Sequence, residues 1–404
     1  MNDLTVAHID RLKSALASTR ATSGTTHGFY LYPARFSPET AHAVIETFSL
    51  PGDCVLDPFM GGGTSVVEGL PLGRTMVGLD LNALAHFVAA TRTRPLSSQD
   101  HTVLRSWAKI ASRNLQQRAR KRGHRVTNLP LAATQFLARA IHESDQLRFP
   151  RQRAFARAVL LRLGQWALDC RDQPSPLIPA MAAKLPQLMD QMLNGLDEFV
   201  QECALVGLKK HQITAARILL CRSSEGLQDD PRIRGLPRPP SLVFTSPPYP
   251  GVHVLYHRWQ LRGRKETPAP YWIAGVEDGF YSSHYTGGSR TSSGEDGYFS
   301  MIRSVFSSVR QVIASDGLVV QLVGFADVST QLPRFQNSMA EAGFVEWTPA
   351  KLAQARISRR VPNRKWYAKI RGTMDTSSEL LLFHRPYEPH TPTSRKPTAP
   401  GKGS

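Results

Sequence analysis

Short apolar runs lie on both sides of a long middle segment of the chain, and amphipathic stretches separate them. Apolar runs of about four to eight residues indicate buried strands, and strands that alternate with helical patterns are typical of an α/β sheet. The predicted strands are residues 53–59, 75–79, 216–221, 242–244, 318–323, 344–347 and 380–383. The pattern therefore predicts an α/β fold whose sheet has seven strands.

The middle segment, residues 95–207, has a different pattern. Apolar residues recur there at positions i, i+3 and i+4, which predicts helices rather than strands. The predicted helices lie near residues 102–121, 130–146, 150–170 and 179–206. We therefore predict a helical insertion within the α/β domain. The predicted organisation is an N-terminal part of that domain at 1–94, the insertion at 95–207, a C-terminal part at 208–385, and a disordered Pro/Thr/Lys-rich tail at 386–404.

The strand at 242–244 leads into Thr245-Ser246-Pro247-Pro248-Tyr249. Neither proline has a backbone N–H, so the chain must leave the sheet here, at the carboxyl end of the strand. Parallel sheets bind ligands beyond these ends, and two prolines fix the backbone so that carbonyl oxygens become pre-aimed acceptors. The sequence thus presents Ser246, Pro247 and Tyr249 as candidate site residues, while an ordinary proline turn is the alternative.

A glycine-rich loop follows the first predicted strand. The sequence Asp57-Pro58-Phe59-Met60-Gly61-Gly62-Gly63-Thr64 leads into a helix, and glycines there let a ligand approach the backbone amides. The loop has neither the Gly-Lys-Ser/Thr of a phosphate-binding loop nor the Gly-x-Gly-x-x-Gly of a dinucleotide fingerprint. The next strand ends at Asp80, which is suited to accept hydrogen bonds from ribose hydroxyls. The pattern predicts a nucleoside cofactor.

Composition narrows the class of partner. The 404 residues include 50 Lys and Arg against 32 Asp and Glu, a net charge of +18, so a polyanion such as nucleic acid is the expected partner. Charge alone leaves a membrane surface open. The sequence has no apolar run of about 18 residues and no signal peptide, which favours a soluble, cytoplasmic protein without a membrane partner. The four cysteines show no Cys-x-x-Cys pairing, so no metal site is predicted.

Basic residues gather in two further segments. Residues 111–126 contain six Lys or Arg and no acidic residue, which suits either a solvated helix end or a phosphate-contacting patch. Residues 356–371 mix basic and aromatic side chains, as nucleic-acid-binding surfaces do, and an exposed hairpin loop is the alternative. The residues of this second segment predicted to bind nucleic acid are Arg359, Arg360, Arg364, Lys365 and Trp366.

Together, the glycine loop and the proline loop resemble one family, the S-adenosylmethionine-dependent DNA methyltransferases that modify exocyclic amino groups. Residues 57–64 resemble the cofactor loop of that family, and 245–249 its catalytic loop. Residues 32–38 are similar to the segment beside the methionine part of the cofactor. The resemblance covers about 27–93 and 213–385, and implies a Rossmann-like methyltransferase sheet. It implies cofactor contacts by Phe36, Asp57, Phe59, Gly61, Gly63, Thr64 and Asp80, and catalytic roles for Ser246, Pro247, Pro248 and Tyr249.

These residues suit the chemistry. An exocyclic amine is a poor nucleophile because the ring delocalises its lone pair, and hydrogen bonds to Ser246 and the Pro247 carbonyl would localise that pair. The base must leave the duplex to react, and Tyr249 is placed to stack on it. Methylation at cytosine C5 needs a cysteine nucleophile, which the proline loop lacks. Amino methylation is therefore preferred.

Within the family, serine at the first position of the tetrapeptide is more common in cytosine-N4 enzymes, so we favour cytosine N4 in DNA over adenine N6. Double-stranded DNA is the expected partner, and a cognate restriction endonuclease is a further partner that the resemblance suggests. The alternatives are an RNA base amino-methyltransferase, a non-catalytic DNA-binding subunit and a nicotinamide-dependent oxidoreductase. The glycine spacing and the charge disfavour the last of these.

Overall fold

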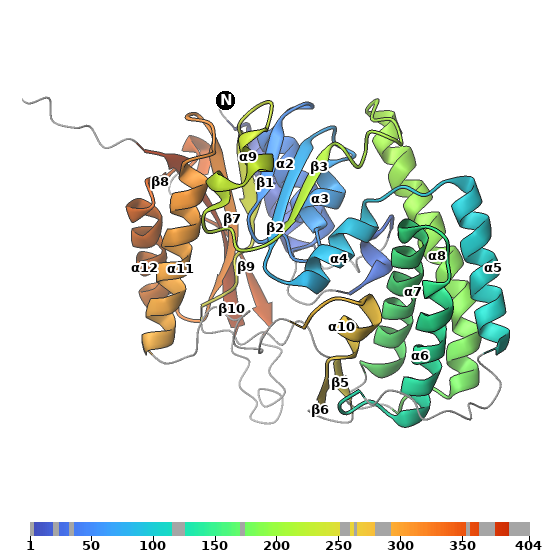
Figure 1. Ribbon diagram of the computed structural model, residues 1–404. Helices are drawn as coiled ribbons and strands as arrows, with labels where there is room; N and C mark the ends of the chain where they lie inside the picture. The colour runs from blue at the N-terminus through green and yellow to red at the C-terminus, as the bar shows by residue number, and fades with distance from the viewer. Residues whose placement is uncertain are drawn as a thin grey trace, which may run out of the picture.

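The protein contains an eight-stranded sheet with helices on both faces (Figure 1). The computed structural model describes residues 4–18, 24–31, 36–114, 126–169, 174–250, 259–261, 265–278, 292–352, 356–362 and 376–387. The strand order is β3-β2-β1-β4-β7-β10-β8, and β9 also pairs with β10. These strands are β1 (Cys54–Asp57), β2 (Thr75–Asp80), β3 (Arg217–Cys221), β4 (Leu242–Thr245), β7 (Leu318–Phe325), β8 (Phe344–Glu346), β9 (Ile357–Pro362) and β10 (Thr376–Pro386).

The predicted α/β class and all seven predicted strands are confirmed. The eighth strand, β9, was not predicted, because Ser358, Arg359 and Arg360 interrupt the apolar residues of its sequence Ile-Ser-Arg-Arg-Val-Pro. It pairs antiparallel with β10, from Leu381 opposite Ile357 to Thr376 opposite Pro362. The segment therefore forms a strand because it pairs with β10, although its own sequence does not indicate one.

Five neighbouring strands are parallel, and their carboxyl ends meet at one edge of the sheet. β1 pairs in parallel with β2 and β4, β2 with β3, and β4 with β7. β10 runs antiparallel to β7, β8 and β9. Loops that follow β1, β2, β3, β4 and β7 thus begin at a common edge, which we call the carboxyl edge.

Alternating apolar residues of the strands face two hydrophobic layers. Val55 and Phe244 pack with one layer, whereas Leu56 and Val243 pack with the other. The first layer includes α1 (Val6–Ala17), η1 (His27–Phe29), α2 (Pro38–Phe48), α3 (Thr64–Gly69) and α4 (Ala83–Arg92). The second includes η2 (Leu227–Asp229), α9 (Pro231–Arg234), α11 (Ser292–Arg310) and α12 (Val328–Glu341). A further 3-10 turn, η4, spans Ala350–Leu352.

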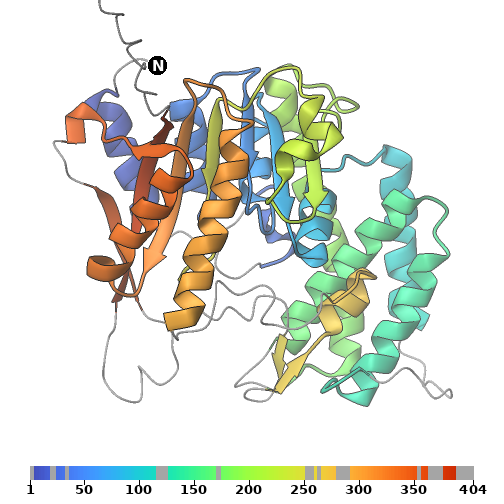
Figure 2. The same ribbon diagram turned by 60° about the vertical axis from the view of Figure 1, so that its left-hand side comes forward.

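Four long helices lie beside the sheet, at the right of Figure 1 and also at the right of the turned view in Figure 2. They are α5 (Ser98–Asn114), α6 (Leu131–Asp145), α7 (Pro150–Leu168) and α8 (Ile178–Leu205). The described part of residues 95–207 contains no strand. We propose that these residues are an insertion within an α/β domain formed by 1–94 and 208–385. The predicted tail lies outside the described residues beyond Tyr387.

A small unit packs against α7 of this bundle. It consists of β5 (Trp259–Leu261), its antiparallel partner β6 (Lys265–Thr267) and α10 (Ala269–Ala274), none of which was predicted. Gly164 of α7 permits the contact, since a Cβ there would lie 2.4 Å from the Trp259 ring. No helix in the described ranges is long and apolar enough to cross a membrane.

Candidate active site

Asp57 joins the two predicted loops at the carboxyl edge. It ends β1 and is fully buried. Its Oδ1 accepts hydrogen bonds from the Phe59 amide (3.1 Å) and from the Thr245 hydroxyl (2.6 Å), and its Oδ2 accepts one from the Ser65 hydroxyl. Thr245 ends β4 and directly precedes Ser246. One carboxylate therefore fixes the start of the glycine loop, the first turn of α3 and the start of the proline loop.

The environment of Asp57 also changes its protonation. Burial raises the pKa of this carboxyl to about 6, while the hydrogen bonds from Ser65 and Thr245 oppose that rise. With these contacts, the side chain acts as a brace between loops, and its hydrogen-bonding capacity is largely used inside the protein. The three hydrogen bonds of Asp57 are thus made to the glycine loop, to α3 and to the end of β4.

The glycine loop curves back onto Asp80 at the end of β2. Asp80 Oδ2 accepts a hydrogen bond from the Gly61 amide (2.9 Å), and its Oδ1 accepts one from the Asn82 amide (2.8 Å). Burial raises the pKa of Asp80 to about 6. Gly61 and Gly63 have φ angles of 50° and 78°, which favour glycine. The structure therefore brings together the predicted glycines and the predicted ribose-binding acid.

Close packing at Gly63 is a second reason for glycine. A Cβ there would lie 2.7 Å from Ala89 Cβ in α4. Thr64 begins α3 directly after it and is buried. Phe59 is half-buried against the layer that contains α11. Phe59 and Gly63 therefore lie on the loop between β1 and α3, and Thr64 is the first residue of the helix that follows.

Arg92, which was not predicted as a site residue, supports the glycine loop through hydrogen bonds. Its fully buried guanidinium donates to the carbonyl oxygens of Gly62 (2.6 Å), His27 (3.0 Å) and Tyr30 (2.5 Å). Tyr30 in turn accepts a hydrogen bond from the Trp259 indole (3.2 Å). Arg92 therefore joins the glycine loop to the aromatic segment near the N-terminus. An arginine in the last turn of a helix is common, so the sequence offers no signal for this role.

The aromatic segment is described only in part, because residues 32–35 lie outside the described ranges. Phe36 is buried, and its ring lies 4.7 Å from the Phe244 ring of β4, centroid to centroid. Ser37 caps α2 by accepting a hydrogen bond from the Thr40 amide (3.1 Å). The predicted cofactor residue Phe36 thus packs against β4, the strand that leads into the proline loop.

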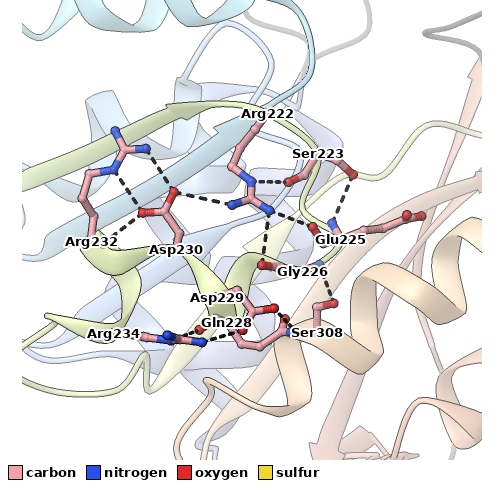
Figure 3. A network of polar contacts seen from close by, with 10 residues as sticks. All are labelled: Arg222, Ser223, Glu225, Gly226, Gln228, Asp229, Asp230, Arg232, Arg234 and Ser308. Atoms are coloured by element: carbon pink, nitrogen blue, oxygen red, sulfur yellow. Dashed lines mark hydrogen bonds and ion pairs between the residues drawn. The ribbon is translucent and has the colours of Figure 1, made fainter.

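The segment after β3, which begins at the same edge, contains a network of polar contacts (Figure 3). Asp230 accepts hydrogen bonds from Arg232 and pairs with Arg222, which also donates to the carbonyls of Ser223 and Glu225. The hydroxyl of Ser224 donates to the carbonyl of Pro58 in the glycine loop (2.6 Å). A compact, internally bonded turn therefore borders the glycine loop on the β3 side.

The proline loop follows β4 with Pro247 buried and Ser246, Pro248 and Tyr249 partly exposed. The Tyr249 ring packs against β7 at Gly324, where a Cβ would lie 2.4 Å from Tyr249 Cε2. Its hydroxyl donates a hydrogen bond of 2.9 Å to Glu379 in β10. Neither Gly324 nor Glu379 was predicted as a site residue.

The predicted nucleic-acid residues are described only in part. Arg359 pairs with Glu379 (2.5 Å) and donates to the Leu16 carbonyl (3.0 Å). Arg360, the next residue of β9, is exposed. Arg364, Lys365 and Trp366 lie outside the described residues, as does most of the basic segment 111–126. Among the residues that are described, no cluster of His, Cys, Asp and Glu is suited to hold a metal ion.

The N-terminal part of the chain is similar to DNA methyltransferases. Residues 12–90 match a family model described as DNA methylase. Type II methyltransferase M.MvaI of Kocuria varians is 32% identical over 108 residues, which cover 26% of this chain and 24% of the relative. Type II methyltransferase M.BsoBI of Geobacillus stearothermophilus is 38% identical over 61 residues, which cover 15% and 12%. These matches confirm the predicted resemblance to DNA amino-methyltransferases, and the chain spans a quarter or less of the length of either relative.

The overall shape is less similar to solved structures. A precorrin-6y C5,15-methyltransferase from Geobacter metallireducens has 10% identity and a TM-score of 0.30, with 89% of this chain and 92% of the other covered. The rRNA methyltransferase aviRa from Streptomyces viridochromogenes has 10% identity and a TM-score of 0.29, with 92% of each chain covered. At such TM-scores the similarity indicates no function.

Proposed function

We propose that this chain is a DNA methyltransferase whose target is the exocyclic N4 amino group of cytosine. The observation that supports the proposal best is the 2.6 Å hydrogen bond from Thr245 to Asp57, because it joins the loop proposed to hold the base to the loop proposed to hold the cofactor. The family match covers the glycine loop and Asp80, whereas residues 246–249 lie beyond it. The activity and the substrate are therefore inferred from the site.

The methyl donor is S-adenosylmethionine, which supplies an electrophilic methyl group. The glycine loop fits the nucleoside part of such a cofactor, because Gly61 and Gly63 have no side chains to obstruct the backbone amides. Each oxygen of Asp80 accepts one backbone hydrogen bond and has capacity for another, which suits ribose hydroxyls. The residues that we propose to hold the cofactor are Phe36, Phe59, Gly61, Gly63, Thr64 and Asp80, with Asp57 as the brace behind them.

The proline loop supplies the groups that act on the base. The Ser246 hydroxyl and the Pro247 carbonyl accept hydrogen bonds from the target amine, which localises the nitrogen lone pair. Pro247 and Pro248 restrict the backbone, so these acceptors keep their positions without a further ordering cost. Tyr249 stacks on the flipped base, and stacking offsets part of the cost of unstacking, which is about a few kcal/mol. None of the four cysteines lies on this loop, so C5 chemistry has no nucleophile.

The choice of cytosine N4 over adenine N6 rests on serine at the first position of the tetrapeptide. The net charge of +18 supports DNA as the substrate, and Arg360, which is exposed, is proposed to contact phosphates. Arg364, Lys365 and Trp366 stay predicted nucleic-acid-binding residues outside the described ranges. A cognate restriction endonuclease is a proposed functional partner. Its proposed role is to cut the same DNA sequence when the base is unmethylated.

The test of this proposal is incubation of the full chain with methyl-labelled S-adenosylmethionine and either duplex DNA or RNA. We expect label in DNA, and loss of that label in Ser246→Ala. Ser175→Ala is the matched control, because this serine lies between α7 and α8 and on neither the glycine loop nor the proline loop. Label that appears in RNA and not in DNA would overturn the DNA assignment. Cofactor binding without transfer to either would support a non-catalytic subunit instead.

A further inference from the structure

Three residues lie side by side across three strands next to the proline loop. Glu379 of β10 is the register partner of Gly324 in β7 on one side and of Arg359 in β9 on the other. In a sheet, residues in register point to the same face. Leu381, two positions after Glu379, packs with the layer that contains α1 and α2, so this row faces that layer. We call Gly324, Glu379 and Arg359 the cross-strand row.

Tyr249 contacts two members of this row. Its ring lies over Gly324, where a Cβ would approach Cε2 to 2.4 Å and Cδ2 to 2.6 Å. Its hydroxyl donates to Glu379 Oε1 at 2.9 Å. The contact with the ring and the hydrogen bond to the hydroxyl together determine the orientation of the Tyr249 side chain. Both the ring and the hydroxyl of Tyr249 are therefore in contact with residues of the sheet.

Arg359 holds Glu379 in turn. Its Nε lies 2.5 Å from Glu379 Oε2, and its Nη1 donates to the Leu16 carbonyl at the end of α1 (3.0 Å). Glu379 is 7% exposed, and a carboxylate so buried needs a charged partner and hydrogen bonds to offset its desolvation. Arg359 supplies the charge, and Tyr249 supplies a hydrogen bond to the second oxygen. The carboxylate is thus held from both sides.

We propose that Glu379 is a positioning residue that holds Tyr249 at the angle needed to stack on the target base, with Gly324 as the seat of the ring and Arg359 as the anchor of the carboxylate. This inference rests on the proposed function. Ordering of the ring before the base arrives lowers the entropy that binding must offset, so the effect falls on the step that uses the flipped base. The row also explains why tyrosine, which has a hydroxyl, occupies this position.

The test is a double-mutant cycle with Tyr249→Phe and Glu379→Gln, both close in shape to the original residues. If Glu379 acts through the Tyr249 hydroxyl, each single change lowers kcat/KM for DNA about tenfold, as loss of a hydrogen bond to a charged group does. The double variant then loses about the same factor, because the same interaction is removed twice. KM for S-adenosylmethionine should not change, whereas general damage to the sheet would alter it.

Losses that multiply to about a hundredfold in the double variant would overturn the inference, since the two residues would then act independently. Unchanged kcat/KM in Glu379→Gln would overturn it as well. Both of these outcomes require methylation by the wild-type chain, so they are distinct from failure of the proposed function. A wild-type protein that transfers no methyl group to DNA would overturn the proposed function and this inference together.

Gly324 gives an independent test of the seat. Gly324→Ala adds a methyl group where the Tyr249 ring lies, so we expect kcat/KM for DNA to fall about tenfold while KM for the cofactor stays the same. Gly297→Ala is the matched control, because a Cβ at this exposed position in α11 meets nothing within 4 Å. Equal activity of the two alanine variants would contradict the proposed seat.

Discussion

The Thr245 hydroxyl donates a 2.6 Å hydrogen bond to Asp57, although 188 positions separate the two residues in the chain. Both side chains are fully buried, and each ends a parallel strand of the sheet. The bond therefore fixes the start of the proline loop against the start of the glycine loop. Because we propose that these loops hold the base and the cofactor, a disturbance of one should reach the other.

Replacement of Thr245 by valine tests this coupling. Valine has the same shape without the hydroxyl, so Asp57 loses one buried donor, and we expect the free energy of unfolding to fall by about 1–3 kcal/mol. We also expect kcat to fall, because the proline loop loses its fixed starting point. Thr267→Val is the control, since Thr267 is equally buried but lies in β6. Equal kcat in the two variants, measured at saturating cofactor, would argue against the coupling.

The raised pKa of Asp57 predicts a pH dependence of stability. Burial raises this pKa from 3.8 to about 6, so the folded protein binds more protons than the unfolded chain between these values. The contribution of this carboxyl to stability is therefore full below 3.8 and is lost as pH rises through about 6. Denaturant titrations at several pH values should show a flatter profile in Asp57→Asn. Parallel profiles for the two proteins would contradict this assignment.

Asp80 predicts a pH dependence of cofactor binding. Burial raises its pKa to about 6, and only the ionised carboxylate leaves both oxygens free to accept from ribose. The dissociation constant for S-adenosylmethionine should therefore increase as pH falls through about 6. Asp80→Ala should bind about tenfold more weakly at neutral pH and lose this dependence. Calorimetric titration of both proteins from pH 5 to 8 measures it, and a pH dependence that persists in the variant would assign it to another group.

Arg92 predicts a link between stability and cofactor affinity. Arg92→Met leaves the carbonyls of Gly62, His27 and Tyr30 without their donor, so we expect a loss of about 3 kcal/mol in unfolding free energy and weaker cofactor binding. Arg105→Met is the control, because Arg105 forms a surface ion pair with Asp190 in the helical bundle. If Arg92→Met binds the cofactor as tightly as the wild type does, Arg92 does not support the glycine loop in the way proposed.

Arg360 predicts a change in the salt dependence of DNA binding. If it contacts a phosphate, Arg360→Gln should reduce the slope of log affinity against log salt by about 1. Arg303→Gln is the control, since Arg303 lies on α11 rather than in β9 and already pairs with Glu341. The slopes follow from fluorescence anisotropy at four or more salt concentrations. The same slope in both variants would show that Arg360 is a solvent-exposed residue of β9 that contacts no phosphate.

Local patterns were enough to predict the strands that carry the glycine loop and the proline loop. The runs at 54–56 and 242–244 are each continuous and apolar, and a proline, which cannot continue a sheet, follows each run within three residues.

Contacts between distant strands could not be predicted in this way. Glu379 faces Gly324 and Arg359 only because β7, β9 and β10 pair in one register, and a shift of one residue would turn Glu379 to the other face. Arg359 therefore looked like one more basic residue of an aromatic, basic segment. Arg92 was missed for a related reason, since its three acceptors come from two other segments of the chain.

Nucleoside mass spectrometry tests the central claim most directly. Duplex DNA of mixed sequence is incubated with the wild-type chain and methyl-labelled S-adenosylmethionine, digested to nucleosides, and compared with the same reaction by Ser246→Ala. The proposal predicts labelled N4-methylcytosine with the wild-type chain and none with the variant. Labelled N6-methyladenine would keep the amine chemistry and overturn the choice of base, whereas 5-methylcytosine, or no labelled DNA nucleoside, would contradict the account.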